Sequence, residues 1–176
     1  MITDAHISEV AFFVILERLP AAKEMFRGIN SATLDGKGRM ALPTRTRETV
    51  SALSENKVVV TIDMREPCLL LYPLSEWEVV QCKLEGLSNI NPQARLLQRL
   101  LIGHATDMDL DAAGRLLLPG MLRDYSQLEK KLVLVGQGNK IEIWSEQNWQ
   151  QRMSVWLEEG AHALVENADM FEGLSV

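Results

Sequence analysis

Two short segments place an aspartate four residues before an arginine: Asp35 to Arg39 and Asp111 to Arg115. A carboxylate at this spacing can hold a guanidinium in one orientation across a turn. An oriented guanidinium presents two parallel N–H donors, which can bind phosphate oxygens or the O6 and N7 atoms of guanine. The residues alone leave a second interpretation open, in which the aspartate only accepts local N–H bonds and pairs with its arginine.

Two further cations lie near the first segment and could contact phosphates. Lys37 stands at the tip of the expected turn, and Arg27 precedes the first expected strand. Each is equally well interpreted as an ordinary solvated surface cation. The net charge of the chain is −6, but residues 26–50 carry five basic side chains against two acidic ones. A positive surface can therefore persist on an acidic protein, and we expect double-stranded DNA as the partner.

Catalytic and metal-binding patterns are missing from the sequence. The histidines, His6, His104 and His162, have no histidine or cysteine three or four residues away. We therefore predict no enzyme activity, no cofactor, no small-molecule ligand and no metal site. Cys68 and Cys82 lie inside apolar segments, which predicts reduced, buried thiols.

The sequence contains an internal repeat. Residues 34–43 match residues 110–119 at a constant offset of 76 positions, and Arg47 and Arg123 keep that offset. A second pair of segments matches at an offset of 72 positions: residues 69–72 with Trp77, and residues 141–144 with Trp149. Because the tryptophans recur at matched positions in apolar segments, we interpret them as core or interface anchors. The repeat predicts two copies of one structural unit.

Each copy predicts the same series of elements around its Asp-x-x-x-Arg turn. Apolar side chains alternate with polar or small ones on both sides of the turn, which indicates the order strand, turn, strand, short helix and then hairpin. Pro43 and Pro119 suit the first turn of the short helix that follows. Ser75 has the pattern of a capping box, and Ser145 can cap the equivalent helix. The remaining strands are expected at residues 58–62, 68–72, 132–135 and 140–144.

The copies are joined by an expected helix, which begins at Asn91-Pro92 and carries an apolar stripe. Residues 1–24 match neither copy, so we expect an N-terminal extension there and regard Met25 as a candidate start. This extension lacks the basic region of a secretory signal, and no apolar run is long enough to span a membrane. The predicted organisation is a first domain at 29–76, a helical connection at 77–104, a second domain at 105–148, and a C-terminal helix with an acidic tail at 149–176.

From Met25 onward the chain resembles the MraZ family of bacterial regulators. The resemblance rests on both Asp-x-x-x-Arg segments and on three further stretches: Met25-Phe26-Arg27-Gly28, residues 67–73 followed by Trp77, and residues 99–105. It implies an α+β, mainly β fold of two tandem AbrB-like modules with packed helices, each module a swapped-hairpin or double-split β-barrel element. It also implies ring-shaped homo-oligomers that bind direct repeats in their own promoter, usually as a repressor of the division and cell-wall gene cluster.

Carried over to this chain, the family's DNA-contacting motif falls on Asp35, Lys37 and Arg39 in the first copy. In the second copy it falls on Asp111 and Arg115, where Ala112-Ala113 replaces Gly36-Lys37 and removes the cation at the tip. We therefore expect a cytoplasmic, nucleoid-associated regulator without a membrane partner. The alternative is a ring-forming protein-interaction scaffold in which the arginine turns are only structural.

Overall fold

The computed structural model describes residues 25–88 and 90–166. The expected N-terminal extension at 1–24 and the end of the acidic tail lie outside the described residues. In the described part, no helix combines the length and apolar character needed to cross a membrane.

Six antiparallel strands form the main sheet, in the order β1-β7-β8-β4-β3-β5. The inner strands are runs of β-branched and other apolar residues, as expected for strands covered on both faces. Within the described residues the sheet is open, with β1 and β5 at its edges, and does not close into a barrel. The strands are β1 (Phe26–Thr33), β3 (Lys57–Ile62), β4 (Leu69–Pro73), β5 (Thr106–Asp109), β7 (Lys131–Gly138) and β8 (Ile141–Ser145).

The two copies exchange strands. From the first copy, β1 pairs with β7 of the second, while β5 of the second copy pairs with β3 of the first. At the centre of the sheet β4 pairs with β8, and Leu70 lies opposite Glu142. The hairpin predicted after the short helix of each copy is confirmed, because β3 pairs with β4 and β7 pairs with β8. The strand before each Asp-x-x-x-Arg turn, in contrast, finds its long partner in the other copy. Among the described residues of the first copy, the strand pairing across this turn is limited to the isolated Leu34–Met40 bridge.

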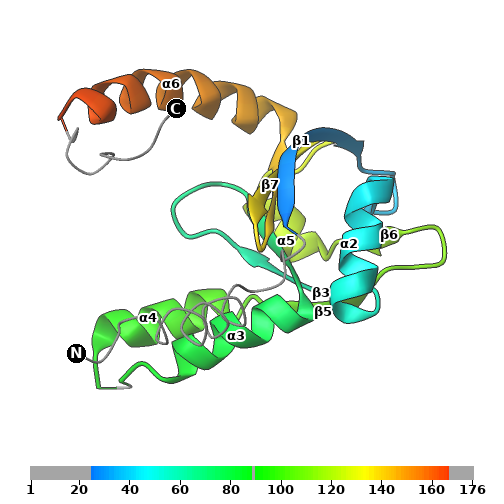
Figure 1. Ribbon diagram of the computed structural model, residues 1–176, viewed down its shortest axis with the longest axis horizontal. Coiled ribbons are helices and arrows are strands. Elements are labelled where there is room, and N and C mark those ends of the chain that lie inside the picture. Colours follow the sequence, from blue (N-terminus) through cyan, green and yellow to red (C-terminus); the bar gives the residue numbers. More distant parts are fainter. Residues whose placement is uncertain (1–24, 89, 167–176) are drawn as a thin grey trace, which may run out of the picture.

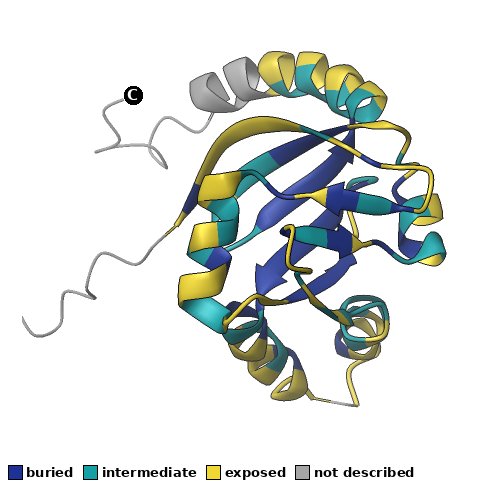
Figure 2. Ribbon diagram, turned by 90° about the vertical axis from the view of Figure 1, so that its right-hand side faces the viewer, coloured by how far each residue is buried: buried dark blue, intermediate teal, exposed yellow. Residues whose placement is uncertain are grey.

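A separate two-stranded ribbon pairs β2 (Arg39–Ala41) with β6 (Arg115–Leu117), again one strand from each copy. Met40 lies opposite Leu116, and both side chains are fully buried beneath the ribbon. Because side chains alternate along a strand, the residues on either side of this central pair face outward. Figure 2 views the molecule from the ribbon side and shows the buried sheet strands behind it.

Two apolar clusters cover the two faces of the sheet. The first lies under the ribbon and includes Val50 of α2 (Thr44–Ser54) and Leu122 of α5 (Gly120–Tyr125). The second lies under α3 (Leu74–Glu85), α4 (Pro92–Leu101) and α6 (Glu146–Glu166). Figure 1 shows α3 and α4 side by side, with α2 and β6 toward the right of the view, where α2 contacts α3.

The repeated tryptophans lie in the second cluster. Trp77 packs against Tyr72 with ring centroids 5.7 Å apart, and Trp149 packs against Trp144 at 5.9 Å. The two contacts are equivalent under the repeat, as the interpretation of both tryptophans as core anchors requires. Trp156 of α6 has no matching tryptophan in the first copy, and it adds a third indole to the Trp144–Trp149 pair.

The helix starts follow the predictions in part. Asn91 caps α4 through hydrogen bonds from Gln93 and Ala94, and Ser145 accepts from the Asn148 N–H, as predicted. The capping box at Ser75 is wrong, because α3 already begins at Leu74, with Pro73 as its capping residue and no side-chain cap.

Two prolines and one cysteine lie in environments that differ from the predictions. Pro43 and Pro119 are the capping residues before α2 and α5, not members of the first helical turn. Cys68 is buried as expected, but Cys82 is exposed because it lies on an uncovered side of α3. Both cysteines are free thiols.

The ribbon allows a matched pair of truncations. We expect Leu116→Ala to lower the free energy of unfolding by about 2–5 kcal/mol, because it leaves a cavity beneath the ribbon. Leu117→Ala, one residue away on the outward face, should change it by less than about 0.5 kcal/mol. Equilibrium denaturation of both variants would test this, and equal effects would contradict the inward and outward assignment.

Candidate nucleic-acid interface

The first turn (residues 35–39) is organised around the carboxylate of Asp35. Its Oδ1 accepts hydrogen bonds from the backbone N–H groups of Lys37 and Arg39, each at 2.9 Å. Its Oδ2 accepts from Arg39 Nε at 2.8 Å. Gly38 adopts a positive φ of 82°, which lets the chain reverse at this point without a Cβ penalty.

The second turn (residues 111–115) repeats this geometry. Asp111 Oδ1 accepts from the backbone N–H groups of Ala113 and Arg115 at 2.9 Å, and Oδ2 accepts from Arg115 Nε at 2.8 Å. Gly114 takes the place of Gly38, with a φ of 71°. Only backbone bonds are needed at the tip, so Ala113 replaces Lys37 without altering the turn.

Both aspartates are held in the ionised form. The Arg39 backbone N–H, followed by the Arg39 side chain and the Lys37 N–H, lowers the pKa of Asp35 from 3.8 to about 2. The equivalent groups of Arg115 and Ala113 lower the pKa of Asp111. Each carboxylate is therefore charged at neutral pH and can hold its arginine in place.

The aspartates leave the ends of both arginines available. Each carboxylate engages Nε, while the Nη atoms of Arg39 and Arg115 have no hydrogen-bond partner in the part of the chain that the structure describes. The two side chains are 34% and 40% exposed. Each turn thus presents a guanidinium with a fixed orientation and two free donor nitrogens.

The ribbon brings the two arginines to one surface. Arg39 lies opposite Leu117 and Arg115 lies opposite Ala41, so the arginines are diagonal neighbours on the outward face. Diagonal side chains on an antiparallel pair are about 7–8 Å apart. Two residues separated by 76 positions in the sequence therefore form a single basic face.

Two arginines that the sequence analysis did not select support these turns. Arg47 of α2 lies over the second turn and donates from Nη1 to the Ala113 carbonyl at 3.2 Å. Arg123 of α5 lies over the first turn, where its Cζ is 3.0 Å from the position of a Cβ on Gly38. An arginine of each copy therefore supports the turn of the other copy. In the sequence, this supporting role could have been inferred from the 76-residue offset that Arg47 and Arg123 share with the two turns.

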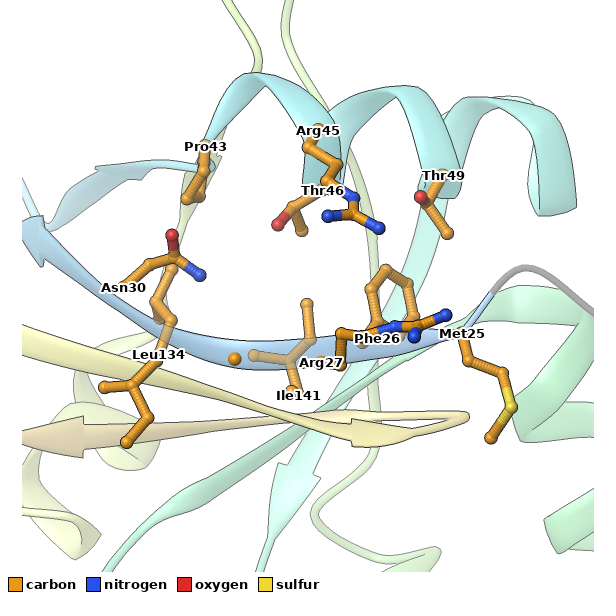
Figure 3. Close-up of a pocket in the computed structure, with 13 residues that line it drawn as sticks. Met25, Phe26, Arg27, Asn30, Pro43, Arg45, Thr46, Thr49, Leu134 and Ile141 are labelled. Carbon is orange, nitrogen blue, oxygen red and sulfur yellow. The ribbon is translucent and has the colours of Figure 1, made fainter.

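The two other predicted cations differ in position. Lys37 is exposed at the tip of the first turn. Arg27 is also exposed but lies near the other end of β1, about 20 Å from the turn at the usual rise of an extended strand. There it lines a cavity of about 160 Å³ between β1 and α2, together with Arg45 (Figure 3). The structure thus groups Asp35, Lys37, Arg39, Asp111 and Arg115 but leaves Arg27 apart.

Comparison with known proteins agrees with this duplicated arrangement. The sequence model described as MraZ protein matches the chain twice, over residues 25–100 and 101–171. The chain belongs to the MraZ family. Together the two matches to the MraZ model cover most of the chain, including both turns and both ribbon strands.

Several curated MraZ relatives are about half identical to the chain. The protein named Transcriptional regulator MraZ from Hydrogenovibrio crunogenus is 56% identical over 124 residues, covering 70% of this chain and 82% of the relative. Its namesake from Legionella pneumophila strain Corby is 51% identical, covering 85% and 94%. That from Halorhodospira halophila is 48% identical, covering 86% and 100%.

The two turn glycines should differ in their tolerance of a side chain. A Cβ on Gly114 would lie 1.9 Å from Arg47 Cδ, whereas a Cβ on Gly38 would lie 3.0 Å from Arg123 Cζ, a much smaller overlap. Both substitutions to alanine should cost about 1–2 kcal/mol for the left-handed backbone, and Gly114→Ala should cost more because Arg47 must move. Denaturation of a double-mutant cycle with Arg47→Ala would measure this. Strict additivity of Gly114→Ala and Arg47→Ala would contradict the contact.

The turn carboxylates should titrate at low pH. We expect an NMR titration midpoint of about 2 for Asp35, so the stability that this carboxylate contributes is complete above about pH 4 and is lost as pH falls toward 2. Arg39→Ala should raise the pKa of Asp35 only part of the way to 3.8, because the backbone N–H is retained. The pKa of Asp111 should not change in this variant. Full recovery of the ordinary Asp35 value would show that the side chain, not the backbone, holds the turn.

Proposed function

We propose that this protein is a sequence-specific, DNA-binding transcriptional regulator without catalytic activity. The observation that carries the proposal is the pair of oriented guanidinium groups on the outward face of the β2–β6 ribbon. The names of the relatives, Transcriptional regulator MraZ, support the same class of function.

The chemistry of the ribbon suits the major groove of DNA. With Nε held by an aspartate, Arg39 and Arg115 can each offer both Nη atoms end-on to the O6 and N7 acceptors of guanine. The major groove, about 12 Å wide, admits a two-stranded ribbon. Asp35 and Asp111 orient the two forks, so their role is positioning.

The remaining cations would contact the DNA backbone. Lys37 is a mobile point charge at the ribbon end and suits a phosphate. Arg27, farther along β1, would reach a phosphate outside the base pairs read by the ribbon. Backbone contacts of this kind add affinity that depends on salt but carry no sequence information.

The assembly and its target follow from the family resemblance. We propose a ring-shaped homo-oligomer in the cytoplasm, associated with the nucleoid, which represses its own division and cell-wall gene cluster by binding direct repeats in the promoter. One ribbon makes few base contacts, so several ribbons in one ring would multiply a weak affinity. The exchanged strands support two AbrB-like swapped-hairpin modules at 29–76 and 105–148, with helical parts at 77–104 and 149–176.

The direct test is a titration of the full chain with the DNA upstream of its own gene, at two salt concentrations and with an unrelated duplex as competitor. Loss of one bidentate base contact costs about 1–3 kcal/mol. Arg39→Ala and Arg115→Ala should therefore each weaken selective binding by about 5- to 150-fold. Arg39→Lys should behave similarly for selectivity while keeping the salt dependence, because lysine retains the charge but not the fork.

Arg95→Ala is the matched control, since Arg95 is exposed on α4 at the other end of the molecule. It should bind like the unchanged protein. Normal selective binding by Arg39→Ala would refute the assigned site. A folded oligomer without selective DNA binding would support the protein-interaction scaffold.

A further inference from the structure

A partly buried cluster of side chains next to the second apolar cluster has no part in the proposed DNA contact. It contains Asp63, Cys68 and Glu142, whose ligand atoms (the thiol sulfur and one oxygen from each carboxylate) all lie within 4.8 Å of one another. Asp63 lies in the loop after β3, Cys68 directly precedes β4, and Glu142 lies on β8. The pairing of β4 with β8 brings the third residue to the other two.

Glu142 occupies a position that the repeat otherwise fills with an apolar side chain. The equivalent residue in the first copy is Leu70, which faces Glu142 across the centre of the sheet. Both are buried, Leu70 at 5% exposure and Glu142 at 9%. Burying a carboxylate where leucine fits is unfavourable unless a partner offsets the loss of hydration. Its Oε2 accepts a hydrogen bond from Trp144 Nε1, and the Gln137 side chain also hydrogen-bonds to this carboxylate. No ion pair holds Glu142 in the described part of the chain.

Cys68 adds a sulfur ligand to the cluster. Its side chain is fully buried, and its thiol has no hydrogen-bond partner among the described residues. Burial, followed by the nearby carboxylates of Glu142 and Asp63, raises the pKa of this thiol above its usual range. A bound divalent cation would instead favour the thiolate form of Cys68, because a coordinating thiol loses its proton to solvent.

The other groups of the cluster are already oriented. Asp63 Oδ1 accepts from the backbone N–H groups of Arg65 and Glu66 at 2.7 and 3.1 Å, which leaves Oδ2 without a partner in the described chain. The neighbouring Glu66 is paired with Arg152, so that guanidinium does not neutralise the cluster. Lys140 acts on Glu142 and Cys68 only through space. Three potential anions therefore converge without a contacting cation.

We propose that Asp63, Cys68 and Glu142 form a site for a borderline divalent metal ion of the Zn²⁺ type. One sulfur and two oxygens suit Zn²⁺, whereas Mg²⁺ and Ca²⁺ prefer oxygen alone. Ligand atoms around a tetrahedral Zn²⁺ are about 3.3–3.8 Å apart, so no pair of these ligand atoms needs to approach by more than about 1.5 Å. Asp63 is only half-buried, which gives the ion an entry path, and water would complete the coordination.

Such an ion would fasten the two copies together. Asp63 and Cys68 belong to the first copy, and Glu142 belongs to the second. The proposal is independent of DNA binding, because none of the three residues lies in the turns or the ribbon.

The test uses the full chain, freed of metal with a chelator and titrated with Co²⁺ and then Zn²⁺. We expect one equivalent per chain, a thiolate-to-Co²⁺ charge-transfer band in the near ultraviolet, and displacement of that band by Zn²⁺. Zn²⁺ should also raise the melting temperature, because it binds only the folded chain.

Two cysteine variants separate this site from adventitious binding. Cys68→Ser should abolish the charge-transfer band, while Cys82→Ser, which removes the exposed thiol, should retain it. Glu142→Leu, which copies the residue of the first repeat, should fold but bind Zn²⁺ at least about tenfold more weakly. Binding of less than one equivalent, or a band that depends on Cys82 instead of Cys68, would overturn the proposal and leave a metal-free, hydrogen-bonded cluster.

Discussion

Neither half of this chain can pair all the backbone N–H and C=O groups of its own strands. A strand that lacks a partner exposes a row of N–H and C=O groups, and burying such a row is costly. In this fold β1 depends on β7, β5 depends on β3, and β2 depends on β6, so each strand that flanks a turn has its main strand partner in the other copy. The apolar cluster beneath the ribbon is shared in the same way. The fold is therefore one cooperative unit built from two similar sequences.

This exchange explains why the two turns are positioned together. Had each copy closed its own hairpin, Arg39 and Arg115 would lie on separate ribbons. Pairing β2 with β6 instead places both on one face, and Arg47 and Arg123 reach across to the opposite turns. The candidate interface is thus a direct product of the same hydrogen bonds that hold the fold together.

The repeat, most elements and the composition of both turns can be predicted from the sequence, because apolar alternation and turn residues act locally. Alternation of Met40 or Leu116 with polar neighbours indicates which side is buried, but it does not identify the partner strand. The same holds for β1 and β5. Because β3 and β7 have nearly equivalent apolar patterns, the choice of β7 by β1 and of β3 by β5 depends on how the whole chain packs. The same limit applies to Glu142 and Cys68, which are 74 positions apart and meet only through the pairing of β4 with β8.

The two turns also differ in charge at the tip, where Gly36-Lys37 of the first turn is replaced by Ala112-Ala113 in the second. A dimer of identical chains could not carry such a difference, since symmetry would copy any change to both ends. Joining the copies in one chain removes that constraint and gives the ribbon one end with an additional cation, Lys37, and one end without it. The two ends of the ribbon surface are therefore different. A duplex lying along this surface would be bound in one direction in preference to the reverse. Polarity of this kind suits sites that recur head to tail and disfavours palindromes.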